Sequence, residues 1–293
     1  MSETTTDKYE SIWQHLARVP HRLGWVDAGG IRTRYIQAGP TDAPALIMVH
    51  GTAGSLEAFC TTLGAHCEHF NCLAFDLVGS GYSDKPDHDY EIDFYVAHLR
   101  NFMKAMNVRK CSLIGISMGT WVTARMAIAH PQEVDRVTFL APFGYSDDAE
   151  EIAGIRTRRG KAFDEPTWPN IKSIFDNLIY SEKKRIPDLI ATRQAMYQSP
   201  QARAAADHIL NLFKPELLKR NLIPAEDWQR IQAPALVVLS IKDKPLYTNT
   251  ARVIAKLIPK AQLFEMDNVG HWPQFEDPDV FNQRNLKFLL ERS

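Results

Sequence analysis

The stretch Cys111-Ser112-Leu113-Ile114-Gly115-Ile116-Ser117-Met118-Gly119 decides the fold of this chain. It opens with an apolar run typical of a buried strand, and a helical pattern follows it over residues 118–130. The Gly-x-Ser-x-Gly turn between them places Ser117 where a strand passes sharply into a helix. The flanking glycines leave room for the strand and helix to approach each other, and the turn exposes the serine. The stretch therefore predicts a nucleophilic Ser117 at the edge of a parallel sheet.

The same alternation of strand and helix extends along most of the chain. Further apolar runs predict strands at residues 24–28, 31–38, 45–49, 70–75, 134–140, 235–240 and 262–266. Helical patterns cover residues 56–66, 90–106, 250–258 and 278–290. The first two strands flank Gly29-Gly30 as a hairpin. We expect an α/β fold in which a mostly parallel, eight-stranded sheet carries helices on both faces.

One segment, residues 144–227, breaks this alternation. It holds no strand-like run and is polar, helical and interrupted by prolines. An insertion at the carboxyl edge of a parallel sheet lies over the usual ligand crevice, so we expect a helical lid. The core domain would then comprise residues 20–143 and 228–293, and residues 1–19 would form an N-terminal extension.

The charge balance excludes some partners. The 293 residues carry 34 Lys and Arg against 35 Asp and Glu, which argues against a nucleic-acid-binding protein. Short basic runs such as Arg156-Thr157-Arg158-Arg159 have acidic neighbours and are expected to be solvated helix faces. No apolar run approaches the ~20 residues of a membrane span, and no secretory pattern is visible.

The cysteines favour a reducing compartment. The chain has four of them, none in a Cys-x-x-Cys pair, so we expect free thiols and a cytoplasmic location. Cys60, Cys67 and Cys72 lie near two histidines but lack a zinc-ligand spacing, and no metal site is predicted.

A serine nucleophile needs a base and an acid that orients the base. Asp243 follows the predicted strand 235–240, and His271 follows the strand 262–266. Both fall at the sheet edge where Ser117 lies, and in the expected chain order. His50 is expected to brace a loop instead. Ser117, Asp243 and His271 are the predicted catalytic triad.

Donors for an oxyanion can come from the backbone. The N–H of Met118 begins the helix after the serine and is one natural donor. The second donor should come from the loop after residues 45–49, with Thr52 preferred and Ala53 as the alternative.

With these residues in place, the chain resembles the α/β-hydrolase superfamily along nearly its whole length. The matching motifs are His50-Gly51, Asp76-Leu77-Val78-Gly79-Ser80-Gly81-Tyr82-Ser83, the serine turn and the histidine loop. Within that superfamily it looks most like the meta-cleavage product hydrolases, which cleave a carbon–carbon bond in 2-hydroxy-6-oxohexa-2,4-dienoates. Gly270-His271-Trp272-Pro273-Gln274-Phe275-Glu276, Ser117-Met118-Gly119 and Arg193 carry this closer resemblance.

The resemblance implies how a substrate would be held. Arg193 and Trp272 would bind the dienoate, since a guanidinium fork can bind a carboxylate and the neighbouring oxygen. The alternatives are a surface ion pair for Arg193 and packing beside the catalytic loop for Trp272. Apolar insertion residues would either line the pocket for the distal substituent or pack the lid; they are Phe175, Leu178, Ile179, Met196 and Phe213. No metal or organic cofactor is implied. The expected partner is the small-molecule substrate, without nucleic acid or membrane, and any assembly is expected to be a homodimer.

Two other functions remain open on the sequence. Ile116 stands where the family commonly has asparagine, so we expect it to lie at the substrate, although its side chain cannot donate a hydrogen bond there. That departure favours a carboxylesterase or lactonase with the same triad. A ligand-binding protein of this fold with little turnover is the second alternative, and fluorophosphonate labelling would separate it from an enzyme.

Overall fold

The computed structural model describes residues 11–291 and contains one sheet of eight strands. These are β1 (His21–Asp27), β2 (Arg32–Ala38), β3 (Ala45–Val49), β4 (Asn71–Phe75), β5 (Cys111–Ile116), β6 (Val134–Leu140), β7 (Ala235–Ser240) and β8 (Ala261–Met266). Their order is β1-β2-β4-β3-β5-β6-β7-β8. β2 runs antiparallel to both neighbours, and every pairing from β4 to β8 is parallel. The predicted fold class is confirmed.

Local sequence explains the hairpin at one edge of this sheet and the buried strands at its centre. Gly29 and Gly30 have φ angles of 74° and 87°, which glycine adopts without strain, and they close the β1–β2 hairpin. The central strands β3, β4, β5 and β7 are buried along their whole length. Short continuous apolar runs suit strands that helices cover on both faces.

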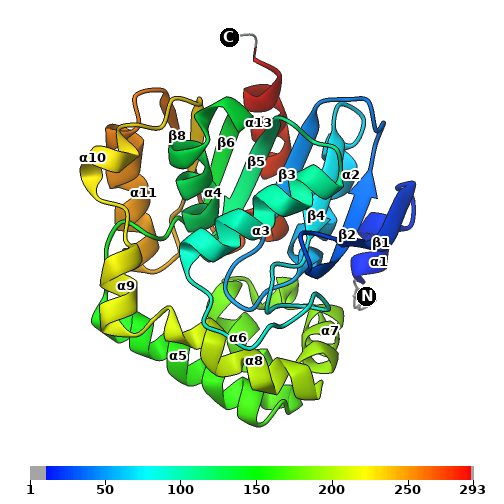
Figure 1. The fold of residues 1–293 in the computed structure, drawn as a ribbon, viewed down its shortest axis with the longest axis vertical. Helices are drawn as coiled ribbons and strands as arrows, with labels where there is room; N and C mark the ends of the chain where they lie inside the picture. Colours follow the sequence, from blue (N-terminus) through cyan, green and yellow to red (C-terminus); the bar gives the residue numbers. More distant parts are fainter. Residues whose placement is uncertain (1–10, 292–293) are drawn as a thin grey trace, which may run out of the picture.

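The core helices are arranged around these strands (Figure 1). They are α1 (Ile12–Leu16), α2 (Cys60–His66), α3 (Ile92–Ala105), α4 (Met118–Ala129), α10 (Ala225–Trp228), α11 (Pro245–Leu257), α12 (Pro273–Glu276) and α13 (Pro278–Leu290). Short 3₁₀ turns are η1 (Leu56–Phe59), η2 (Pro131–Glu133) and, in the insertion, η3 (Glu182–Lys184). In Figure 1, α3 and α4 lie in front of the sheet and α13 lies behind it.

One helix begins earlier than the sequence pattern predicted. The expected helix 250–258 is part of α11, which starts at Pro245. Proline is favoured in the first helical turn because its fixed φ suits a helix and its missing N–H would have no partner there. This early start places the first turn of α11 directly after Asp243.

The chain between β6 and β7 is helical throughout and forms a layer at one end of the sheet, the lower end in Figure 1. Its helices are α5 (Ala149–Asp164), α6 (Trp168–Leu178), α7 (Pro187–Tyr197), α8 (Pro200–Asn211) and α9 (Pro215–Asn221). The two ends of this insertion meet where the Ile223 N–H donates to the Gly144 carbonyl over 2.8 Å. α10 lies beyond that junction and packs against α4 and α11, so it belongs with the core rather than with the insertion.

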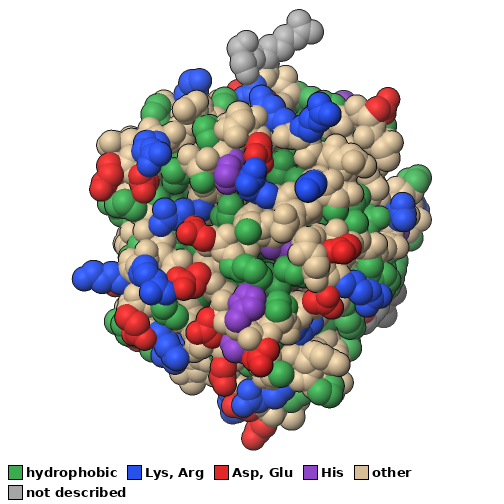
Figure 2. All heavy atoms as spheres, in the orientation of Figure 1, with side chains coloured by type: hydrophobic (Ala, Val, Ile, Leu, Met, Phe, Trp, Pro, Cys, Tyr) green, Lys and Arg blue, Asp and Glu red, His purple; other side chains and the backbone are tan. Residues whose placement is uncertain are grey.

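Two features of residues 11–291 concern possible partners. None of the helices there is both long enough and apolar enough to cross a bilayer. No group of three or more His, Cys, Asp or Glu side chains in that range is placed to hold a metal ion. Figure 2 shows acidic and basic side chains interspersed over the visible face, without a large region of one sign.

Candidate active site

Ser117 occupies a strained turn between β5 and α4. Its φ and ψ are 56° and −121°, a conformation that costs a non-glycine residue on the order of 1–3 kcal/mol. A side chain at Gly115 would come within 2.5 Å of the Gly119 carbonyl, and one at Gly119 within 2.1 Å of the Val49 carbonyl. Only glycine fits at these two positions. The surrounding contacts therefore hold Ser117 in this conformation, as a nucleophile turn requires.

His271 and Asp243 meet beside this serine. Nδ1 of His271 lies 3.0 Å from Oδ2 of Asp243, and both side chains are almost wholly buried. The other carboxylate oxygen accepts the Lys244 N–H over 2.8 Å. The ring of Tyr247 packs edge-on against the imidazole at 4.3 Å. This arrangement fixes the imidazole so that Nε2 is left for the serine side of the site.

Ser117 and His271 line the same cavity, so the structure brings the three predicted triad residues together. Asp243 follows β7 and His271 follows β8, while Ser117 follows β5. Because parallel strands end at the same edge of a sheet, loops far apart in sequence converge there.

The predicted oxyanion donors also face this region. Within residues 11–291, neither the Met118 N–H nor the Thr52 N–H donates to a protein acceptor, and Thr52 lines the cavity. Ala53, the alternative, does not line the cavity, and its carbonyl accepts the Tyr197 hydroxyl over 3.1 Å. The geometry therefore supports Thr52 over Ala53 as the second donor.

His50 braces the Thr52 loop, as expected. Its Nδ1 lies 2.7 Å from the Gly51 carbonyl, and its Nε2 accepts the Leu77 N–H over 2.9 Å. Burial lowers the pKa of His50 to about 4. The ring is therefore neutral at physiological pH, with Nδ1 as donor and Nε2 as acceptor.

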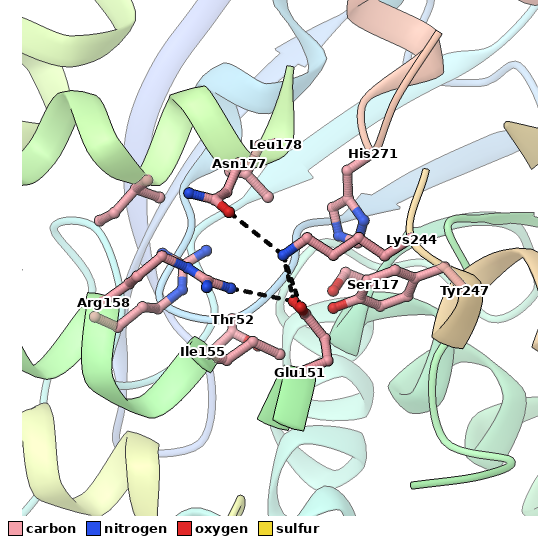
Figure 3. A pocket seen from close by; sticks show the side chains of 12 residues that line it. Thr52, Ser117, Glu151, Ile155, Arg158, Asn177, Leu178, Lys244, Tyr247 and His271 are labelled. Carbon is pink, nitrogen blue, oxygen red and sulfur yellow. Dashed lines mark hydrogen bonds and ion pairs between the residues drawn. The ribbon is translucent and has the colours of Figure 1, made fainter. Parts of the chain in front are cut away.

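The cavity has two lobes that share Ser117, His271 and Thr52. We name one the Arg193 lobe, which contains Arg193, Trp272, Gly51 and Gly54. The other, which we name the charged lobe, contains Glu151, Arg158 and Lys244 and is shown in Figure 3. A substrate attached at Ser117 can thus extend in two directions.

Arg193 is the most unusual residue of its lobe. Its side chain is buried, and its Nε and Nη1 atoms have no hydrogen-bond partner among the described residues. Its guanidinium carbon lies 5.6 Å from the ring centroid of Phe175 and 5.7 Å from that of Tyr197. Burial is the main cause that lowers the pKa of Arg193, and the charge of Arg159 acts in the same direction. A buried cation with free donors is ready for an anionic ligand.

Trp272 lines this lobe, whereas Phe175 and Ile116 do not line either lobe. Phe175 is fully buried behind the lobe, where it contacts Trp272 edge-on at 5.8 Å as well as Arg193. Ile116 is the last residue of β5 and is completely buried in the sheet core. Phe175 therefore packs behind Arg193, which is the packing alternative, and Ile116 packs the sheet core instead of facing the cavity as expected.

The expectation of a solvated basic run was wrong for two residues of α5. Arg158 and Arg159 line the charged lobe, together with Glu151 and Ile155 of the same helix. These four residues are separated by four, three and one positions, so they lie on one face of the helix. An inward-facing helix surface is usually recognised by apolar residues, but three of these four residues are charged. Arg156 of the same run is exposed, as expected.

Glu276 links the histidine loop to the insertion, a role that no local sequence pattern indicates. Its carboxylate accepts the Gly270 N–H over 2.8 Å and the Tyr180 and Ser181 N–H groups over 2.9 and 3.1 Å. Burial raises the pKa of Glu276, although these N–H groups oppose that effect. The His271 N–H also donates to the Leu178 carbonyl over 2.9 Å. The catalytic loop and the end of α6 are thus held together.

Comparison with known proteins places this geometry in a family. The family described as alpha/beta hydrolase fold matches residues 44–278. The chain is 26% identical over 278 residues to the 2-hydroxy-6-oxo-6-(2'-aminophenyl)hexa-2,4-dienoic acid hydrolase of Metapseudomonas resinovorans, covering 92% of this chain and 91% of that one.

Two solved structures illustrate the shared fold. The 2-hydroxy-6-oxo-6-phenylhexa-2,4-dienoate hydrolase of Rhodococcus sp. strain RHA1 matches with a TM-score of 0.84 and 20% identity, over 93% of this chain and all (100%) of that chain. The enol-lactonase of Burkholderia xenovorans LB400 matches with a TM-score of 0.76 and 20% identity, over 92% and 100%. One fold thus carries two differently named reactions, so only the site can choose between them. The match over most of its length shows that this chain belongs to the alpha/beta hydrolase fold family.

Proposed function

We propose that this protein is a serine hydrolase that cleaves a carbon–carbon bond in 2-hydroxy-6-oxo-2,4-dienoates, the products of meta ring fission in aromatic catabolism. The observation that carries the proposal is the buried Arg193, which lines the cavity beside Ser117 and whose Nε and Nη1 atoms have no hydrogen-bond partner among the described residues. Such a group matches the carboxylate and adjacent oxygen at one end of the dienoate. The relative from Metapseudomonas resinovorans, whose name describes this chemistry, supports it.

In the proposed reaction, Arg193 holds the carboxylate end of the dienoate, and Trp272 lies beside it. The dienol first becomes the keto form: the 2-hydroxyl loses its proton and C5 gains one, which prepares the C5–C6 bond for cleavage. His271 then removes the proton of Ser117, whose Oγ attacks the C6 carbonyl carbon. The N–H groups of Met118 and Thr52 donate to the oxyanion that forms there.

Cleavage follows from this intermediate. The C5–C6 bond breaks, and its electron pair enters the dienolate, whose charge Arg193 stabilises. The proton held on His271 passes to that fragment. Water, activated by His271, then releases the C6 acyl group from Ser117 as a carboxylic acid. Asp243 holds the imidazole in the required tautomer and supports its positive charge.

The helical insertion is proposed to act as the lid of this site. Leu178 of the insertion lines both lobes, and Arg193 comes from α7. Closing such an element over the substrate would exclude water while the dienolate forms. A homodimer and a cytoplasmic location stay predictions, which light scattering and cell fractionation would check.

The deciding experiment compares two substrate classes on the same enzyme. Bleaching of 6-phenyl and 6-alkyl 2-hydroxy-6-oxo-dienoates is followed beside hydrolysis of a nitrophenyl ester. A kcat/KM above ~10⁴ M⁻¹s⁻¹ on a dienoate supports the carbon–carbon hydrolase. Rapid ester hydrolysis with every dienoate inert would overturn it and leave the carboxylesterase or lactonase alternative.

A further inference from the structure

The cavity around Ser117 carries an excess of positive charge. The charged lobe is lined by Arg158, Arg159 and Lys244, and Arg193 lies in the other lobe. Within residues 11–291, Glu151 is the one Asp or Glu side chain that lines either lobe. An aryl or alkyl substituent alone would leave most of these cations facing an apolar group, which is costly in a partly enclosed site.

Glu151 is already shared between two of these cations. Both of its carboxylate oxygens lie 2.7 Å from Nζ of Lys244, and Oε1 also lies 3.1 Å from Nη2 of Arg158. Figure 3 shows Lys244 and Arg158 converging on this carboxylate in the cavity that Ser117 and His271 also line. One carboxylate therefore neutralises only part of the charge of the pair.

Arg159 adds a further cation between the two lobes, both of which it lines. Its side chain is buried, and it has no carboxylate partner among the described residues; its Nη1 lies 3.3 Å from the Tyr197 hydroxyl. A buried guanidinium bonded only to a phenol retains donors for an anion. No carboxylate among the described residues neutralises Arg159, so its guanidinium is available to an anionic ligand in the cavity.

The other residues that line the charged lobe restrict the chemistry of a ligand that fits it. Ile155, Ile174 and Leu178 supply apolar surface, and Asn177 adds an amide whose oxygen lies 3.4 Å from Nζ of Lys244. Such a lining suits a short aliphatic segment that ends in an anionic group.

We propose that the charged lobe selects substrates whose C6 substituent is a short aliphatic chain ending in a carboxylate, which Arg158, Arg159 and Lys244 recognise. This inference rests on the proposed function and names its substrate class. The substrate is then a dioate, with one carboxylate at Arg193 and the other in the charged lobe. Hydrolysis adds the hydroxyl of water to C6 and a proton to C5, so the acid released is a dicarboxylic acid.

The experiment uses a pair of substrates that differ in one group. The first is a 2-hydroxy-6-oxo-dienoate with –CH₂–CH₂–COO⁻ on C6, and the second carries –CH₂–CH₂–CH₃. Their dissociation constants are measured by calorimetry on the full chain carrying Ser117→Ala, which needs no turnover. The carboxylate substrate is expected to bind at least tenfold more tightly, and the wild-type kcat/KM is expected to show the same preference.

Charge variants made in the Ser117→Ala background give opposite expected signs, which a merely structural role would not produce. Arg158→Met should reduce the preference about tenfold, whereas Glu151→Gln should increase it, because it removes the competing anion. Arg156→Met is the matched control, since this arginine lies on the exposed face of the same helix. It should leave the ratio of the two dissociation constants unchanged.

The possible results of these experiments distinguish the dioate inference from the carbon–carbon hydrolase proposal. Equal binding of the pair, or a preference that Arg158→Met and Glu151→Gln do not move in opposite directions, overturns the dioate inference. Tighter binding of a C6 2-aminophenyl substrate would also overturn it and assign Glu151 to an amine. If the wild-type protein bleaches no dienoate while Ser117→Ala still prefers the carboxylate, the charge preference stands and the carbon–carbon hydrolase proposal fails.

Discussion

At Ser117, the chemistry depends on backbone strain that the neighbours impose. The turn is held by the Ser117 N–H, which donates to the Leu140 carbonyl over 3.0 Å, and by the close contacts of Gly115 and Gly119. None of these contacts involves the serine hydroxyl. Removing Oγ should therefore leave the fold intact while it removes the nucleophile.

Ser117→Ala is accordingly expected to lower kcat on the best substrate by a thousandfold or more, as for other triads, with an unchanged circular dichroism spectrum. Single-turnover kinetics and fluorophosphonate labelling measure the loss. Turnover near the wild-type rate in a folded Ser117→Ala protein would rule out the triad mechanism.

Arg193 combines its proposed role in substrate binding with a cost in stability. Burial strips water from a guanidinium that has two atoms without partners. Arg193→Met keeps much of the packing against Phe175 and Tyr197 and removes this cost. We expect Tm to rise by ~1–4 °C in calorimetric scans, while kcat/KM for an acidic dienoate falls about a hundredfold or more. A neutral ester should lose far less.

Arg185→Met is the control for this change. Arg185 belongs to the same insertion, but its guanidinium donates to the Ile179 carbonyl over 2.9 Å and pairs with Asp176 over 3.2 Å. Its replacement should lower Tm and should not discriminate between the two substrate classes. An equal loss on both substrates in Arg193→Met would show that Arg193 only supports the fold.

At the level of elements, Glu276 in the short helix α12 ties the histidine loop to the end of α6. A glutamine there keeps the shape but has a single acceptor oxygen, so one side of the link must lose its hydrogen bonds. Glu276→Gln is expected to lower kcat about tenfold through a less well-positioned His271 and to lower Tm by a few degrees.

Steady-state kinetics with thermal melts measure both effects, and Glu265→Gln is the control because Glu265 is exposed on β8. A Glu276→Gln variant with unchanged kcat and Tm would contradict the linking role.

Other elements show which patterns local sequence reveals. The strands and the hairpin follow from short apolar runs and paired glycines, and their predicted bounds lie within a few residues of the observed ones. The face of α5 that lines the cavity was not predicted, because Glu151, Arg158 and Arg159 are charged. A row of charged residues looks the same in the sequence whether that helix face meets solvent or a ligand cavity.

At the scale of the whole molecule, the insertion is attached to the core on the outside as well as at the active site. His208 of α8 lies between two acidic residues of the loop after β4. Its Nε2 is 2.9 Å from Asp87 and its Nδ1 is 2.9 Å from Asp89. The hydrogen bond with Asp89 is the main cause that raises the pKa of His208 above 6.5.

This contact makes the docking of the insertion sensitive to pH. A histidine whose pKa is raised in the folded state contributes stability below about pH 6.5, and the contribution is lost as pH rises through the higher folded pKa. We expect the Tm difference between wild type and His208→Asn to be ~1–2 °C near pH 6 and to vanish near pH 9, since the pair is largely exposed. Thermal melts across that range check the sign. A difference that grows with pH would contradict it.

The sequence alone determined the fold class, the order of strands and helices, and the three residues proposed for catalysis. Each has a local signal: apolar runs of strand length, a Gly-x-Ser-x-Gly turn, and an acid and a histidine that each follow a strand. Only the tertiary structure decided which charged side chains face the cavity, that Ile116 and Phe175 do not line it, and that Glu276 joins the insertion to the histidine loop. These facts depend on the packing of α5, α6 and α7 over the sheet edge. Contacts between segments distant in sequence leave no local pattern from which they could be predicted.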